Sequence, residues 1–203
     1  MKRILQVGGF IAGLVLIAFG AVAIYMGASG RSTVTDNLKQ EAIVGSPDMT
    51  PTAIKAEAAK AGLKDVVFPT CSVANKKVTD GASARCFASY MRIHALEATG
   101  GQTFANMPRY ATADGKGTND PTKATQANGA PVDNAARNIW VNETALSTAL
   151  NVSYMADQLA LFGVVVGIAL LLTGIGLVIL AGAALRPVRE GEKAATAGTL
   201  ATA

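Results

Sequence analysis

Three features of this sequence could support chemistry: a single histidine, a pair of cysteines and one run of oxygen-bearing side chains. His94 lies in a helical pattern next to Ile93 and Leu96, with Arg92 and Glu97 nearby, which is typical of a partly buried structural histidine. The Gly-x-Ser-x-Gly, P-loop, dinucleotide-binding and HExxH motifs do not occur in the sequence. We therefore predict that the protein is not an enzyme and has no catalytic residue and no cofactor.

The run from Asp114 to Asp120 (DGKGTND) has the composition of a calcium-binding loop but not its pattern. Lys116 occupies a position where a calcium loop needs another oxygen ligand, and no Glu closes the run with a bidentate carboxylate. Two cysteines and one distant histidine make an equally poor transition-metal site. We interpret the run as an Asx/Gly turn and predict no metal site.

Cys71 and Cys86 are the only cysteines. An even number of cysteines in an oxidising compartment indicates a disulfide bond. A bridge that closes a loop of about 16 residues would stabilise the fold by roughly 3 kcal/mol in the chain-entropy model. We predict this disulfide, on condition that the cysteines lie in an exported segment.

Two long uncharged segments flank the cysteines: residues 4–30, with 27 residues, and residues 158–185, with 28. About 20 apolar residues suffice for a helix to cross a hydrocarbon core roughly 30 Å thick, and lipid offers no other partner for the backbone. We predict two transmembrane helices. A cleavable signal peptide is the alternative for the first, although its apolar region is longer than the roughly 7–15 residues usual in such peptides.

Basic residues near the ends of the spans predict the orientation. Lys2 and Arg3 lie in the N-terminal segment 1–3, and further basic residues lie in the segment 186–203, which is expected to be a disordered tail: Arg186, Arg189 and Lys193. Because positive charge favours the cytoplasmic side, we expect both termini in the cytoplasm and residues 31–157 outside. That segment carries 13 Lys and Arg against 12 Asp and Glu, so no nucleic-acid partner is expected.

The extracytoplasmic segment divides into a stalk and a small domain. Residues 31–43 and 143–157 keep helical spacing without Pro or Gly, which predicts that both spans continue as an antiparallel helical stalk. Between them we expect a helix over 51–61, a β segment at 65–68, a helix over 82–98, and an extended segment at 138–141 before a helix cap at Asn142. Residues 111–131 contain no apolar side chain larger than Ala and predict an exposed loop, a candidate contact surface.

Small residues recur in both apolar segments. Gly9 and Gly13 form one Gly-xxx-Gly motif, and Gly163 and Gly167 form another; seven-residue spacing adds further positions, namely Gly20, Gly27 and Gly174. Such faces let helices approach closely. The partner is the other span, a second copy or another membrane protein. Neither segment contains a charged residue of the kind that marks an ion pathway, which argues against a transporter.

Several stretches, including GGFIAGLVLIAFG, ARCFASYMRIHALEATGG and RNIWVNETALSTALN, resemble a family of uncharacterised small two-span membrane proteins from actinobacteria. Many members carry the automatic name "aromatic ring-opening dioxygenase", which implies a non-haem iron site of histidines and carboxylates. With His94 alone, this sequence cannot supply two histidine ligands, so we treat that name as mistaken. The resemblance implies the same topology in a bacterial cell membrane.

Together these patterns predict a mainly α membrane protein with two antiparallel transmembrane helices, extended into a stalk that carries a small α or α+β domain with a disulfide. The favoured function is a non-enzymatic accessory or assembly protein. It would lie in the lipid bilayer, pack with a membrane protein partner or a second copy through the glycine faces, and present the domain outside. The alternative is a ligand-binding sensor domain, which a pocket ringed by four aromatic residues would support: Tyr90, Phe104, Tyr110 and Trp140.

Overall fold

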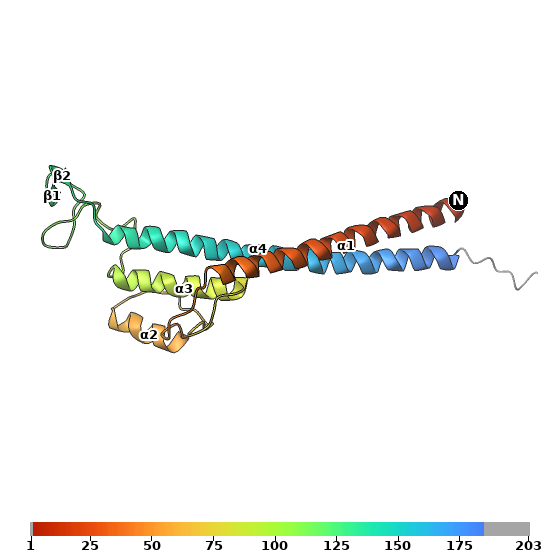
Figure 1. Cartoon of the computed structure of the whole chain (residues 1–203), viewed down its shortest axis with the longest axis horizontal. Coiled ribbons are helices and arrows are strands. Elements are labelled where there is room, and N and C mark those ends of the chain that lie inside the picture. The colour runs from red at the N-terminus through yellow and green to blue at the C-terminus, as the bar shows by residue number, and fades with distance from the viewer. Residues whose placement is uncertain (1, 185–203) are drawn as a thin grey trace, which may run out of the picture. The chain divides into compact units, whose positions relative to one another are not determined.

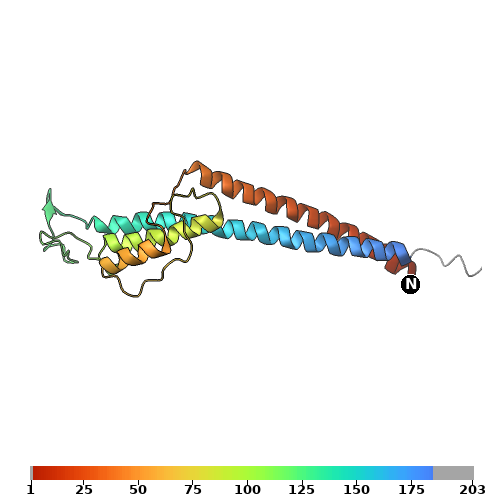
Figure 2. The same cartoon turned by 90° about the horizontal axis from the view of Figure 1, so that it is seen from below.

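A computed structural model describes residues 2–184 of the chain, and the basic residues of the C-terminal tail lie outside this range. The fold is mainly helical, as predicted (Figures 1 and 2). In chain order the elements are α1 (Lys2–Gln40), α2 (Pro51–Lys60), α3 (Gly81–Ala98), β1 (Gln126–Ala127), β2 (Ala130–Pro131) and α4 (Ala136–Ala184).

The described residues form two compact units. The first contains residues 2–29 of α1 and 160–184 of α4, and the second contains residues 30–159. This division falls next to the boundaries at residues 30 and 158 that the charge pattern suggested. Both long helices run through the division without a break, so the continuation predicted for each apolar helix is present.

The first unit is an antiparallel helix pair. Its buried positions recur every seven residues along each helix: Gly13, Gly20 and Gly27 on α1, and Gly167, Gly174 and Ala181 on α4. Both helices are long and apolar enough to cross a membrane. Their most apolar windows are only 11% and 17% buried, whereas a core helix of a soluble protein is mostly buried. Large apolar side chains such as Phe10, Phe19 and Phe162 cover the outer surface.

The second unit is built around α3, which packs between α2 and the first half of α4 (Figures 1 and 2). Its main core draws on both long helices, through Leu38 of α1 and Leu150 of α4. The predicted disulfide is present and joins Cys71 to Cys86, with the two Cα atoms 6.1 Å apart. Tyr90 is fully buried beside it, and its hydroxyl donates to the Cys71 carbonyl at 2.7 Å.

Local sequence signals explain where α3 begins and how it packs. Asp80 is the N-cap, and its carboxylate accepts from the Ser83 backbone N–H at 2.7 Å, while Ser83 Oγ accepts from the Asp80 backbone N–H. Such a reciprocal cap satisfies amides that the first helical turn leaves free. The first helical residue is Gly81, where a Cβ would lie 2.9 Å from Tyr154 Cα of α4. A glycine here therefore allows the helix start to contact α4.

Three local predictions differ from the structure. Residues 65–68 form no strand, and residues 138–141 belong to α4, which begins at Ala136 rather than after a cap at Asn142. The earlier start has a physical cause: Asn134 Oδ1 accepts from the Ala136 backbone N–H, and Arg137 Nη1 donates to the Met107 carbonyl at 2.9 Å. The 111–131 segment is largely exposed, as expected, but it folds back through the short β1–β2 hairpin.

Candidate functional site

The glycine faces of the two apolar helices meet each other. A Cβ at Gly20 would lie 2.7 Å from the Gly167 carbonyl oxygen, and a Cβ at Gly167 would lie 2.7 Å from the Gly20 carbonyl oxygen. Gly13 and Gly174 make the same reciprocal contact, at 2.8 and 2.6 Å. Real Cβ atoms essentially never approach other atoms this closely. These positions therefore require glycine for the helix backbones to touch.

The four glycines of the Gly-xxx-Gly motifs have different surroundings. Gly13 and Gly167 lie in the closely packed face, whereas Gly9 lies 3.8 Å from Ala181 Cβ and Gly163 lies 3.7 Å from the Ala23 carbonyl, measured from a Cβ built on each glycine. The seven-residue repeat, rather than the four-residue motif, marks the contact. Of the three possible partners, the one in contact with the glycines in this structure is the other apolar helix of the same chain.

In the second unit, one exposed face of α4 has apolar and small side chains at alternating spacings of four and three residues. We call it the α4 face and define it as Val141, Ala145, Thr148, Val152 and Met155. The three largest apolar side chains of the face, those of residues 141, 152 and 155, are 53%, 57% and 62% exposed. The 4–3 spacing is the a/d repeat of helices that pair side by side.

Two shallow clefts border the α4 face. An apolar cleft of about 540 Å³ lies between Phe104 and the start of α4, where Trp140, Val141 and Ala145 line it. A second cleft, of about 460 Å³, lies between α3 and α4, and Arg92 and Val152 are among its lining residues. Both clefts share Thr144 and Thr148. The α4 face is thus continuous with a groove that extends along the helix.

The four aromatic residues suggested for a sensor pocket do not surround one cavity. Tyr90 is buried in the main core, and burial raises the pKa of its phenol. Trp140 belongs to a second small core, where its Nε1 donates to the Gln102 carbonyl at 2.8 Å. Phe104 is 42% exposed beneath the Arg137 guanidinium, and Tyr110 pairs with loop residues near β2. Only Trp140 and Phe104 line the same cleft.

The Asp114–Asp120 run forms hydrogen-bonded turns, as predicted. Asp114 Oδ1 accepts from the Thr112 hydroxyl and from the Lys116 backbone N–H at 3.2 Å, and these bonds lower the pKa of the Asp114 carboxyl. Asp120 Oδ1 accepts from the backbone and the hydroxyl of Thr122, which lowers its pKa in the same way. The oxygens of the run therefore satisfy its own backbone and hydroxyl groups.

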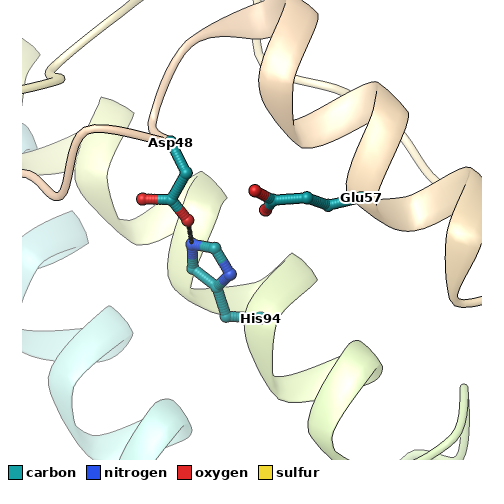
Figure 3. Close-up of side chains that lie close together, drawn as sticks. All are labelled: Asp48, Glu57 and His94. Atoms are coloured by element: carbon teal, nitrogen blue, oxygen red, sulfur yellow. Dashed lines mark ion pairs between the residues drawn. The ribbon is translucent and has the colours of Figure 1, made fainter.

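His94 is half-buried on α3, as the helical pattern suggested, but its neighbours come from three elements (Figure 3). Its Nδ1 lies 3.2 Å from Glu97 Oε2, and its Nε2 lies 3.3 Å from Asp48 Oδ2, in the loop before α2. Glu57 of α2 points toward the same space. Sequence reasoning missed this cluster because Asp48, Glu57 and His94 are far apart in the chain, and no spacing rule joins them.

Models of protein families, curated proteins and solved structures gave no match to this chain.

Proposed function

We propose that this chain is a non-enzymatic accessory protein of a membrane, in which the glycine-packed helix pair crosses the bilayer and the second unit is an extracytoplasmic interaction domain. The outer surface of the helix pair supports the anchor, because it is apolar on the sides that face away from the glycine contact. Such a surface is costly in water and suited to lipid. The disulfide supports an oxidising location for the domain.

The observation that carries the interaction role is the α4 face. The glycine face of the first unit is already covered by the other apolar helix. We therefore assign the glycine contacts to stabilising the anchor and not to recruiting a partner. By contrast, Val152 and Met155 are more than half exposed, on a helix whose opposite side is buried through Leu150. A partner helix lying along α4 would bury this side by a/d packing.

A role in binding is favoured over catalysis by the partners of the reactive side chains. Both cysteines are consumed in the disulfide. The single histidine contacts the carboxylates of Asp48 and Glu97 rather than a hydroxyl or thiol that it could activate. Within residues 2–184, the one imidazole base is therefore not hydrogen-bonded to a hydroxyl or thiol that it could activate for covalent catalysis.

Site-specific crosslinking tests this proposal. A photoreactive amino acid at Val152 should give one discrete adduct in native membranes, either with a second copy or with another membrane protein. Val67 provides the matched control, since it is 91% exposed in the same unit but belongs to the segment between α2 and α3. Equal crosslinking at both positions, or no adduct at Val152, would refute a partner on the α4 face.

A second copy would lie in the same membrane in the same orientation, so its α4 would run parallel. Parallel two-fold pairing places each residue of the face opposite its own copy. Val152→Cys should then form a disulfide-linked dimer on mild oxidation, and Val67→Cys should not. A heterologous adduct without this dimer would assign the face to a different protein.

A further inference from the structure

The side chain of His94 lies among more negative charge than it can balance. Figure 3 shows two carboxylates beside it, those of Asp48 and Glu57, and Glu97 Oε2 adds a third at 3.2 Å from Nδ1. Within residues 2–184, the recorded ion pairs of these carboxylates involve only His94, and no lysine or arginine pairs with them. One imidazole, neutral or protonated, leaves this cluster with an excess of negative charge.

The hydrogen bonding of His94 leaves one ring nitrogen unsatisfied. Glu97 Oε2 accepts from Nδ1 at 3.2 Å, which places a proton on that nitrogen. Nε2 is buried from solvent and makes no hydrogen bond, although Asp48 Oδ2 is only 3.3 Å away. A proton on Nε2 would not form a hydrogen bond in this geometry. A lone pair there would face a carboxylate, which is repulsive unless a cation lies between them.

We propose that His94 Nε2, Asp48 and Glu57 bind a divalent first-row transition metal ion such as Zn²⁺ or Mn²⁺. One potential ligand atom from each residue lies within 4.8 Å of the other two. Metal–ligand bonds of about 2.0–2.2 Å separate tetrahedral ligands by roughly 3.4 Å, so the most distant pair of ligand atoms must close by up to about 1.4 Å, the difference between 4.8 and 3.4 Å. One nitrogen and two carboxylates suit borderline metals.

Glu97 acts as a positioning residue for this site. A carboxylate on the far nitrogen of a ligating imidazole fixes its tautomer and raises its basicity. Glu97 makes this contact from one helical turn after His94, so the orientation of the ring is set within α3 itself. Three protein ligands leave at least one coordination position for water, and the side chains of His94 and Asp48 are 27% and 30% exposed, although Nε2 itself is buried.

The three ligands are held by well-packed neighbours. On α2, Glu57 lies three residues after Ile54 and directly before Ala58, and both of these neighbours are buried. On α3, His94 lies between Ile93 and Ala95, which are also buried. Asp48 precedes buried Met49, whose carbonyl accepts from Ser72 Oγ at 3.1 Å. A bound metal would therefore join α2, α3 and the loop before α2.

The sequence provides a clean background for the test. His94 is the only histidine, and no thiol is free, so imidazole coordination reports on this site alone. The full chain in mild detergent is stripped with a chelator and titrated with Zn²⁺ by calorimetry, and with Co²⁺ while the imidazole NMR signals are recorded. We expect one equivalent to bind and the single set of imidazole signals to shift at that equivalence point.

Three variants and one control decide the outcome. His94→Gln and Glu57→Gln should each weaken Zn²⁺ binding at least tenfold, and Glu97→Gln by about tenfold to a hundredfold, the usual effect of losing an outer-shell partner. Asp114→Asn, which removes an exposed carboxylate of the 111–131 loop, should leave the affinity unchanged. If His94→Gln does not fold, the imidazole shift in the unaltered protein still gives a result. Unmoved imidazole signals, or equal affinity in His94→Gln and Asp114→Asn, would mean an adventitious ion only and would overturn the proposal.

Discussion

Replacing Gly20 with Ala should loosen the pair of apolar helices that we propose as the membrane anchor. The new Cβ would lie 2.7 Å from the Gly167 carbonyl oxygen and 2.8 Å from the Leu171 nitrogen, where ordinary contact begins at 3.4 Å. The backbones must therefore separate by about 0.7 Å, the difference between 3.4 and 2.7 Å. Overpacking of this kind costs about 1–3 kcal/mol, and the helix preference of Ala offsets up to about 1 kcal/mol. Because the Cβ meets backbone atoms that no side-chain movement can clear, we take the upper part of that range, about 2–3 kcal/mol, and expect a net loss of about 1–2 kcal/mol.

An engineered disulfide between the two helices allows this loss of pairing free energy to be measured. In a Gly9→Cys/Ala181→Cys background, the two Cβ atoms would lie 3.8 Å apart, close to the mean of about 3.8 Å found in disulfides. Equilibration with glutathione buffers gives the effective concentration of the two thiols in the reduced pair. Gly20→Ala should lower it by about 5- to 30-fold, as 1–2 kcal/mol requires. The native disulfide is followed separately by mass spectrometry.

Gly176→Ala is the matched control, because a Cβ at Gly176 meets nothing within 4 Å. It should leave the effective concentration unchanged or raise it slightly through better helix propensity. Equal values for Gly20→Ala and Gly176→Ala would refute the close glycine contact. A disulfide formed between two chains rather than within one would refute the pairing of the two spans.

Three further substitutions test the domain. Arg31→Met should destabilise the domain by about 1–3 kcal/mol in chemical denaturation, because Asp157 loses its 2.9 Å ion pair and its side chain is only 9% exposed. The double variant Arg31→Met/Asp157→Leu should recover much of that loss. Tyr90→Phe should cost about 1 kcal/mol at neutral pH through loss of the bond to the Cys71 carbonyl. Since burial raises the pKa of Tyr90, its protonated form stabilises the fold below the unfolded pKa near 10, and this stabilisation is lost as pH rises through the folded value. Alkaline denaturation should therefore shift upward in Tyr90→Phe, and an unchanged midpoint would contradict this reasoning. Cys71→Ser/Cys86→Ser should lose roughly 3 kcal/mol, and a loss below about 1 kcal/mol would show that the packing around α3 holds this segment without the bond.

The parts of the fold that depend on local pattern were predictable. Charge-free length identified both apolar helices, the helix predicted over 51–61 corresponds to α2, and the cysteine count led to the disulfide. The prediction of an extended segment at 138–141 was wrong, because its β-branched and aromatic residues suggested a strand-like chain. Tertiary contacts favour the helix there, because Trp140 of α4 packs in a second small core with Ala95 and Met107.

The candidate sites show the same division between local and long-range information. The seven-residue glycine spacing was visible in the sequence, but which helix would fill the groove was not, because spacing carries no register between distant segments. The cluster around His94 depends on Asp48 and Glu57, which only the packing of the loop and α2 against α3 brings to it. Close approach of Gly45 to Val73 contributes to this arrangement, since a Cβ at Gly45 would collide with the Val73 carbonyl oxygen.

The most direct test of the membrane-anchored arrangement is the accessibility of single introduced cysteines in intact cells that express the chain. Lys60→Cys lies at the exposed end of α2 in the domain, and Lys193→Cys lies in the segment after the second span. A membrane-impermeant maleimide should label Lys60→Cys in intact cells, and Lys193→Cys only after permeabilisation. Protection of Lys60→Cys in intact cells, or labelling of both positions, would contradict a two-span anchor that holds the domain outside.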